Sequence, residues 1–397
     1  MVSLSARDCT ADTSLILGQA NGPFKVSYNA RDLLLYALGI GCSTKRNGNA
    51  TNGSSADELR FLHEKHAAGF RAFPTYPLVL PYKGTSSDVV NFPGPTLHLV
   101  PHGLQGLVEP MSILHYDQSL DIVRPLDPKG ATLETRSEVV GLYQRRGGIL
   151  VRTASTLTDG KGKILSVSTK GTFIRGLKIT GDAGPALPSH VPRPSGPPDA
   201  VSRVTVSSEQ ALLYRLSGDY NPLHADPEAA RAAGLTGTIL HGLCTLGIAA
   251  RQILLQYCSG EPSALNHVSC RFSRTVRPGE LLEVNMWRSE RADLGKIIKD
   301  SGQSIDKASI TADPLERCTG LGAWPQRHGI YLREFGLVGK SGKVTEQVIR
   351  FEVCAPEQAG AVVVADGKAV LLLEEGSLRL LVGEKYSEID SERRPRL

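Results

Sequence analysis

Apolar residues along the chain follow two patterns, one typical of strands and the other of a buried helix. Residues 149–157 (ILVRTASTL) and 166–174 (SVSTKGTFI) are rich in β-branched residues, and Asp159-Gly160 between them favours a turn, so they predict an antiparallel hairpin. Residues 243–257 (LCTLGIAARQILLQY) are apolar on nearly every face. A surface helix carries only an apolar stripe, so this segment predicts a helix buried in a core.

Further strand-like segments accompany this helix. They lie at residues 132–142, 281–287, 344–353 and 361–373. A helical bundle would fit these segments poorly. We therefore predict an α+β fold in which antiparallel strands wrap a long buried helix, which is the hot-dog arrangement.

The chain also contains an internal repeat. Leu34-Leu35-Tyr36 resembles Leu212-Leu213-Tyr214, and Val123-Arg124-Pro125 resembles Val276-Arg277-Pro278, each ahead of a predicted strand and in the same order. Residues 181–200, rich in Pro and Gly, indicate a linker between the two copies. These features predict a double hot-dog, two units fused in one chain.

The predicted divisions are an N-terminal extension (1–24), a first unit (25–180), the linker (181–200), a second unit (201–375) and a C-terminal tail (376–397). Residues 289–343 interrupt the second unit and show weak periodicity of either kind. A loop of this length is uncommon in a compact domain. A surface insertion, a disordered segment and a stretch foreign to the mature protein all stay open.

Composition supports a globular protein and excludes several classes. Hydrophobic residues make up 41% and charged residues 21% of the 397, which excludes wholesale disorder, collagen and coiled coils. The formal charge of +5 suits an anionic ligand, but no dense basic run indicates nucleic acid. The seven cysteines are scattered without a C-x-x-C pair, so we expect reduced thiols in an intracellular protein and no metal site.

The two ends of the chain bear on its location. Residues 1–22 lack an apolar core behind a basic stretch, so we expect no signal peptide, and the apolar run 33–40 is far shorter than the ~20 residues of a membrane span. Pro395-Arg396-Leu397 is a loose variant of the Ser-Lys-Leu peroxisomal signal. We expect a peroxisomal protein with an import receptor among its partners, or otherwise a cytoplasmic one.

The densest polar cluster is at residues 217–224 (SGDYNPLH), where Asp219, Asn221 and His224 can converge in one turn. Adding water across an activated double bond needs one group that takes a proton and another that delivers one. Asp219 and His224 can divide these roles, and Asn221 can orient the water or a ligand amide. The alternative is structural, because Asp-x-Asn-Pro also suits turns and helix caps, and His224 can satisfy a backbone group.

His241-Gly242-Leu243 opens the predicted buried helix. The backbone N–H of Gly242 would lie in the first helical turn, unpaired within the helix and at the positive end of its dipole. Such an N–H suits a thioester oxygen that gains negative charge during the reaction. The alternative is a glycine that serves packing or the turn.

These residues carry a family resemblance. The run 211–227 (ALLYRLSGDYNPLHADP), followed by 239–245 (ILHGLCT), closely resembles the R-specific enoyl-CoA hydratases, the hydratase 2 or MaoC-like family. The match is nearest to the hydratase part of peroxisomal multifunctional enzyme type 2. The first half joins through 36–41, 73–77 and 115–125, and the resemblance covers about 25–287 and 344–375.

The resemblance implies a double hot-dog with Asp219 and His224 as the catalytic pair, Asn221 beside them and Gly242 N–H as oxyanion donor. It also implies hydration of 2-trans-enoyl-CoA to (3R)-3-hydroxyacyl-CoA in peroxisomal fatty-acid β-oxidation. We expect no cofactor, since CoA is part of the substrate. No dinucleotide fingerprint is present, so we expect a hydratase without the dehydrogenase of the multifunctional relative. The substrate-binding residues and a homodimeric state stay open.

Two alternatives remain at this point. One is another hot-dog acyl-CoA enzyme, a thioesterase or a dehydratase, although a thioesterase usually places its carboxylate or base elsewhere. The other is a non-catalytic acyl-CoA-binding protein.

The first half has no counterpart of the polar cluster. Aligned on the repeat, Gly41, Ser43 and Arg46 fall opposite Asp219, Asn221 and His224. None of the three can supply an acid–base pair. We therefore expect one site per chain, within 200–375, with residues 25–180 as scaffold and pocket for the acyl tail.

Overall fold

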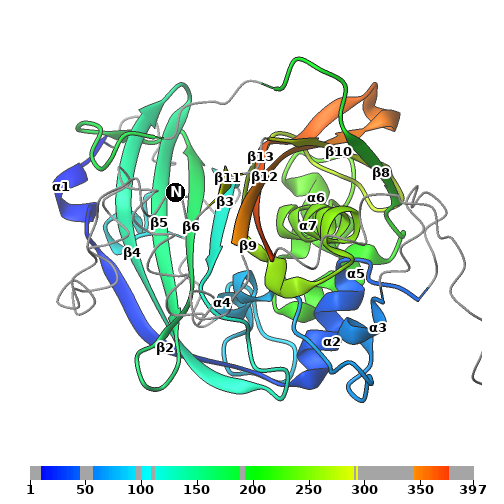
Figure 1. The fold of residues 1–397 in the computed structure, drawn as a ribbon. Helices are drawn as coiled ribbons and strands as arrows, with labels where there is room; N and C mark the ends of the chain where they lie inside the picture. Colours follow the sequence, from blue (N-terminus) through cyan, green and yellow to red (C-terminus); the bar gives the residue numbers. More distant parts are fainter. Residues whose placement is uncertain are drawn as a thin grey trace, which may run out of the picture.

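A single antiparallel sheet runs through both halves of the protein (Figure 1). The computed structural model describes residues 10–44, 57–94, 100–108, 112–187, 193–289, 292–293 and 344–374. Its 11-stranded sheet has the order β2-β4-β5-β6-β3-β9-β13-β12-β10-β8, with β11 paired to β12. This is the double hot-dog that the sequence predicts.

The strands of this sheet are β2 (Ala20–Tyr28), β3 (Ile113–Ile122), β4 (Ala131–Arg145), β5 (Gly148–Thr158), β6 (Ile164–Arg175), β8 (Ala200–Thr205), β9 (Leu265–Phe272), β10 (Leu281–Arg288), β11 (Ala292–Asp293), β12 (Val344–Ala355) and β13 (Ala361–Glu374). A separate two-stranded sheet pairs β1 (Thr10–Ala11) with β7 (Lys178–Ile179). The α-helices are α1 (Thr13–Ile16), α2 (Ala30–Gly39), α3 (Leu59–Leu62), α4 (Leu80–Lys83), α5 (Gln210–Tyr214), α6 (Pro227–Ala232) and α7 (Gly242–Cys258). The 3-10 helices are η1 (Tyr76–Leu78), η2 (His102–Leu104), η4 (Arg215–Ser217), η5 (Pro222–His224), η6 (Pro262–Ala264) and η9 (Pro356–Gln358).

The predicted hairpin and buried helix are both confirmed. β5 and β6 pair along their length, and the turn between them contains Asp159. α7 is buried on nearly its whole circumference, as its largely apolar sequence predicts. None of the described helices is long and apolar enough to cross a membrane.

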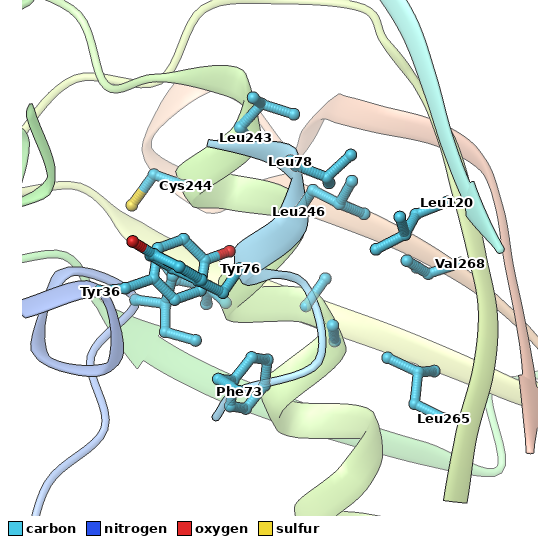
Figure 2. Close-up of a cluster of buried hydrophobic side chains, with 14 of the residues drawn as sticks. Tyr36, Phe73, Tyr76, Leu78, Leu120, Leu243, Cys244, Leu246, Leu265 and Val268 are labelled. Carbon is cyan, nitrogen blue, oxygen red and sulfur yellow. The ribbon is translucent and has the colours of Figure 1, made fainter. Parts of the chain in front are cut away.

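α7 lies at the centre of the main core, and Figure 2 shows the side chains gathered around its amino-terminal half. Tyr36 and Tyr76 pack edge to face, with ring centroids 5.3 Å apart. Leu120 of β3 and Val268 of β9 are paired across the two halves, and both are fully buried. The residues under α7 therefore come from both copies of the repeat.

The repeat is visible in how the halves meet. β3 and β9 pair antiparallel in the middle of the sheet, and each is followed by one of the two Val-Arg-Pro segments. α2 packs against α5, with the rings of Tyr36 and Tyr214 5.8 Å apart. The Gln210 side chain donates hydrogen bonds to the backbone oxygens of Leu38 and Gly39 at the end of α2. The matching segments therefore contact each other directly.

The segment expected as an N-terminal extension contains regular structure from residue 10 onward. β1, α1 and the first residues of β2 lie within it. Ile16 packs with Leu104, Val151 and Ile174 in a second core on the first half of the sheet. Burial of these apolar side chains ties the segment to the first unit.

Several predicted features lie largely or wholly outside the described residues. They are the insertion apart from 289 and 292–293, the tail 376–397, the middle of the linker at 188–192, and two of the cysteines, Cys9 and Cys318. The other five cysteines are free and buried, as expected of reduced thiols.

A buried ion pair joins Arg251 of α7 to Glu58 at the start of α3. Arg251 is 2% exposed, and its guanidinium bonds both carboxylate oxygens of Glu58, with Nε–Oε1 2.5 Å and Nη2–Oε2 2.7 Å. Glu58 precedes α3 in the first half, so the pair joins the halves. Removing one partner would leave an uncompensated charge in the core.

We predict that Glu58→Gln or Arg251→Met alone lowers the free energy of unfolding by about 3–5 kcal/mol, and that the double variant loses less than the sum. Urea unfolding followed by circular dichroism measures both. The control is Arg203→Met, which breaks the exposed Arg203–Glu283 pair and should cost no more than about 1 kcal/mol. Single core variants as stable as the control would contradict the prediction.

Candidate functional site

The turn that carries the polar cluster is held by a glycine. Gly218 has φ +125, and a Cβ there would lie 2.6 Å from the backbone nitrogen of Lys83. Only glycine tolerates this conformation and this approach. The contact fixes the path of the chain into Asp219.

Asn221 holds the turn together. Its backbone N–H donates to Asp219 Oδ1 at 3.2 Å, and its side-chain oxygen accepts from the N–H of Leu223 at 3.2 Å, capping η5. The structural alternative for Asn221 is therefore present in the fold. Its expected role beside a water or a ligand stays a prediction, which follows only from the hydrogen-bonding capacity of its side-chain amide.

His224 has one ring nitrogen engaged with the backbone. Nδ1 lies 2.8 Å from the carbonyl oxygen of Ile239. Because a carbonyl can only accept, Nδ1 carries the proton in the neutral ring. Nε2 then has a lone pair, which is what a proton acceptor needs.

His241 lies against both members of the pair. Its ring stacks on that of His224 with centroids 3.5 Å apart and planes at 22°. Its Nε2 lies 3.1 Å from the backbone oxygen of Asp219. Local sequence patterns predict no role for His241 itself.

Burial brings the pKa values of the two candidate catalytic groups closer together. It raises the pKa of Asp219, an effect opposed by His224, by the N–H of Asn221 and by Lys170. It lowers the pKa of His224, an effect opposed by Asp219. The carboxyl and the imidazole can therefore share a proton at lower cost than in water.

Gly242 is the first residue of α7, so the helix itself cannot use its N–H. Gly242 lines a cavity of about 1150 Å³ together with Asp219, Asn221, His224 and His241. The ring of Phe272 lies close to its Cα, 3.1 Å from where a Cβ would be. The fold thus brings the four residues predicted from the sequence to one cavity.

The first half also lines this cavity, and it brings polar side chains near Asp219, which local sequence patterns did not reveal. His115 of β3 and Lys170 of β6 line it, and Lys170 is near enough to Asp219 that each shifts the pKa of the other. Burial lowers the pKa of His115 to about 3, and Lys170 adds to the shift. The one sequence feature that could have indicated Lys170 is its position in the middle of a predicted strand rich in β-branched residues.

Asp219, His224 and His241 offer donor atoms within 4.8 Å of one another, a spacing that could suit a metal ion. The lone pair of an imidazole lies in the plane of its ring. Two rings stacked at 3.5 Å cannot both direct lone pairs at one ion. The arrangement therefore suits proton transfer better than metal binding.

Among the described residues of the first half, the repeat places no acid–base pair opposite Asp219 and His224. Gly41 and Ser43 stand where the alignment predicts no acid or base, and Arg46 lies outside the described residues. Within the part of the chain that the structure describes, the carboxylate–imidazole pair of this alignment lies in the second half.

Two family models match the chain side by side. The MFE-2 hydratase 2 N-terminal domain matches residues 26–176, and the MaoC like domain matches residues 190–308. The first match covers most of the first half of the sheet, and the second covers β8, β9, β10 and β11 of the second half but not β12 and β13.

Similar proteins support the same assignment. A probable enoyl-CoA hydratase 2 of Dictyostelium discoideum is 33% identical over 317 residues, which cover 78% of this chain and 99% of that protein. Peroxisomal multifunctional enzyme type 2 of Drosophila melanogaster is 35% identical over 288 residues, 70% of this chain and 44% of that protein.

A solved structure agrees with the fold. The MaoC-like dehydratase of Phytophthora capsici has a TM-score of 0.68 and 33% identity, and the alignment covers 91% of this chain and 97% of that one. With its fold, its polar cluster and both domain matches in agreement, the chain belongs to the MaoC-like hydratase 2 family.

Proposed function

We propose that this protein is an R-specific enoyl-CoA hydratase, a hydro-lyase that adds water to 2-trans-enoyl-CoA and gives (3R)-3-hydroxyacyl-CoA. The observation that carries the proposal is the convergence of a carboxylate, an imidazole and a helix N-terminus on one cavity. The names of the relatives support it. The reaction is acid–base chemistry, and we propose that it needs no cofactor.

Water addition follows from the protonation states at the site. Nε2 of His224 accepts a proton from water as the oxygen bonds to C3, and Asp219 stabilises the imidazolium that forms. The pair then returns that proton to C2. Since both groups lie on one turn, hydroxyl and proton reach the same face of the double bond.

The charge that develops on the thioester oxygen is stabilised by the N–H of Gly242. This N–H is supported by the positive end of the α7 dipole. The hydrogen bond strengthens as the enolate forms, so it favours the transition state over the substrate.

The rest of the cavity suits an acyl-CoA. Its lining contains more basic than acidic side chains: Arg145, Arg146, Arg152, Lys170, Arg175, Arg271, Arg274, Arg350 and Lys368 against Asp117, Asp121, Asp219 and Asp366. This surplus suits the phosphates of CoA. We propose that the acyl tail extends over the first half of the sheet, past Thr172 toward the second core.

We also propose that the protein acts in peroxisomal fatty-acid β-oxidation. The Drosophila relative is named as peroxisomal, and the sequence ends in Pro395-Arg396-Leu397, which lies outside the described residues. An import receptor that reads this tripeptide is the partner that the proposal implies.

Purified protein should remove the enoyl absorbance of crotonyl-CoA and decenoyl-CoA and release no free CoA. Chiral chromatography of the product should give the 3R isomer. Release of CoA would indicate a thioesterase, and neither reaction would indicate a binding protein. A 3S product would show that the stereochemical assignment is wrong.

Asp219→Asn and His224→Gln should each lower kcat by about 10²–10⁴, because each removes a positioned proton-transfer group. The double variant should be scarcely slower than either single one, since the two groups act on one water. Asp226→Asn is the matched control, because Asp226 only caps α6 and asparagine also caps well. A single variant that keeps more than about a tenth of the wild-type kcat would refute the assignment.

The tail proposal predicts selective loss of long substrates. Thr172→Phe fills space at the cavity wall, so it should lower kcat/KM for decenoyl-CoA at least about tenfold more than for crotonyl-CoA. Thr158→Phe, at the end of β5 and outside the cavity lining, is the control. Equal losses on both substrates would place the tail elsewhere.

A further inference from the structure

One buried histidine touches both members of the proposed catalytic pair without belonging to it. His241 is 2% exposed and precedes α7 as its N-cap residue, but its side chain makes no capping hydrogen bond. Its imidazole instead contacts the backbone of Asp219 through Nε2 and the ring of His224 through its face. The ring of Tyr214 lies on it as well, with centroids 4.9 Å apart.

The contacts define the protonation state of His241. The Asp219 carbonyl can only accept, so Nε2 carries the proton and Nδ1 has a bare lone pair. Nδ1 is buried and has no hydrogen-bond partner among the described residues. Burial holds the pKa of His241 well below its usual range, and His224 and Arg215 lower it further.

A neutral imidazole at this position lowers stability, because it buries a hydrogen-bond acceptor that has no partner among the described residues. A buried acceptor left without a partner costs about 1–3 kcal/mol, whereas a phenyl ring would stack on His224 without that penalty. What a phenyl ring cannot provide is the Nε2–H that bonds Asp219. The choice of histidine therefore points to the hydrogen bond.

We propose that His241 is a positioning residue that fixes Asp219 through its Nε2–H and the His224 imidazole through its stacked ring. The inference rests on the proposed function and adds to it a residue outside the catalytic pair. Because His241 stays neutral, no like charge next to His224 opposes its protonation during turnover.

Two substitutions separate the two contacts. His241→Phe keeps a ring over His224 and removes the donor to Asp219, whereas His241→Gln keeps an N–H near the position of Nε2 and removes the ring. His63→Gln is the control, since His63 is exposed and does not line the cavity.

His241→Phe should lower kcat by about 10–100-fold, with KM within about threefold of wild type, because a misplaced carboxylate affects the chemical step more than binding. The acid limb of its kcat/KM profile should stay in place. His241→Gln should lose less in kcat than His241→Phe.

In His241→Gln the acid limb should move to higher pH. In the wild type burial lowers the pKa of His224, and water admitted where the ring was relieves that burial and raises it. The neutral form of His224, which accepts the proton from water, is then protonated at a higher pH. Among the described residues, the other charged group that shifts the pKa of His224 is Asp219, which Lys170 influences in turn, and neither is altered.

The ring nitrogens of His224 can be followed by ¹⁵N NMR without substrate, so this part of the test stands even if enoyl-CoA is not hydrated. Absence of hydration in the wild type would count against the proposed function. An unchanged His224 titration in His241→Gln would count against the positioning role.

Wild-type kcat in His241→Phe, within about twofold, would overturn the inference, as would losses confined to the melting temperature. If His241→Phe does not fold, His241→Gln decides through its acid limb and its His224 titration.

Discussion

The burial of α7 is the constraint on which the rest of the structure depends. An apolar circumference requires a cover on all sides, and the antiparallel strands of both halves supply it. The amino-terminal end of a buried helix still carries N–H groups that the helix cannot use. Here that end opens into the cavity, and Gly242 and His241 are consequently placed beside the polar turn at Asp219.

The two halves line one cavity but contribute different groups to it. The second half supplies the carboxylate–imidazole pair and the helix N-terminus. The first half supplies Glu58 beneath α7, together with His115 and Lys170 in the cavity wall. Continuous pairing of β3 with β9 holds these groups in register, so the first half is more than a scaffold for the second.

The electrostatics of the site follow from burial. His115, His224 and His241 all have pKa values lowered by removal from water, and the pKa of Asp219 is raised for the same reason. A buried site with few net charges costs less to form than one with several ions. It also leaves the pair able to exchange a proton, which hydration requires.

The amino-acid sequence by itself determined the hairpin of β5 and β6, the buried helix α7, the repeat, and the turn that brings Asp219 and His224 together. Each of these depends on residues close in the chain, whose spacing shows hydrophobic periodicity, turn chemistry or a family motif. The packing of residues 10–24 onto the first unit, the capping bond of Asn221 and the ring stack of His241 on His224 were decided only by the tertiary structure. Lys170 reaches Asp219 from the other half of the chain for the same reason. Contacts between segments far apart in the chain depend on how strands and helices pack against each other. The pattern of residues within one segment does not determine that packing.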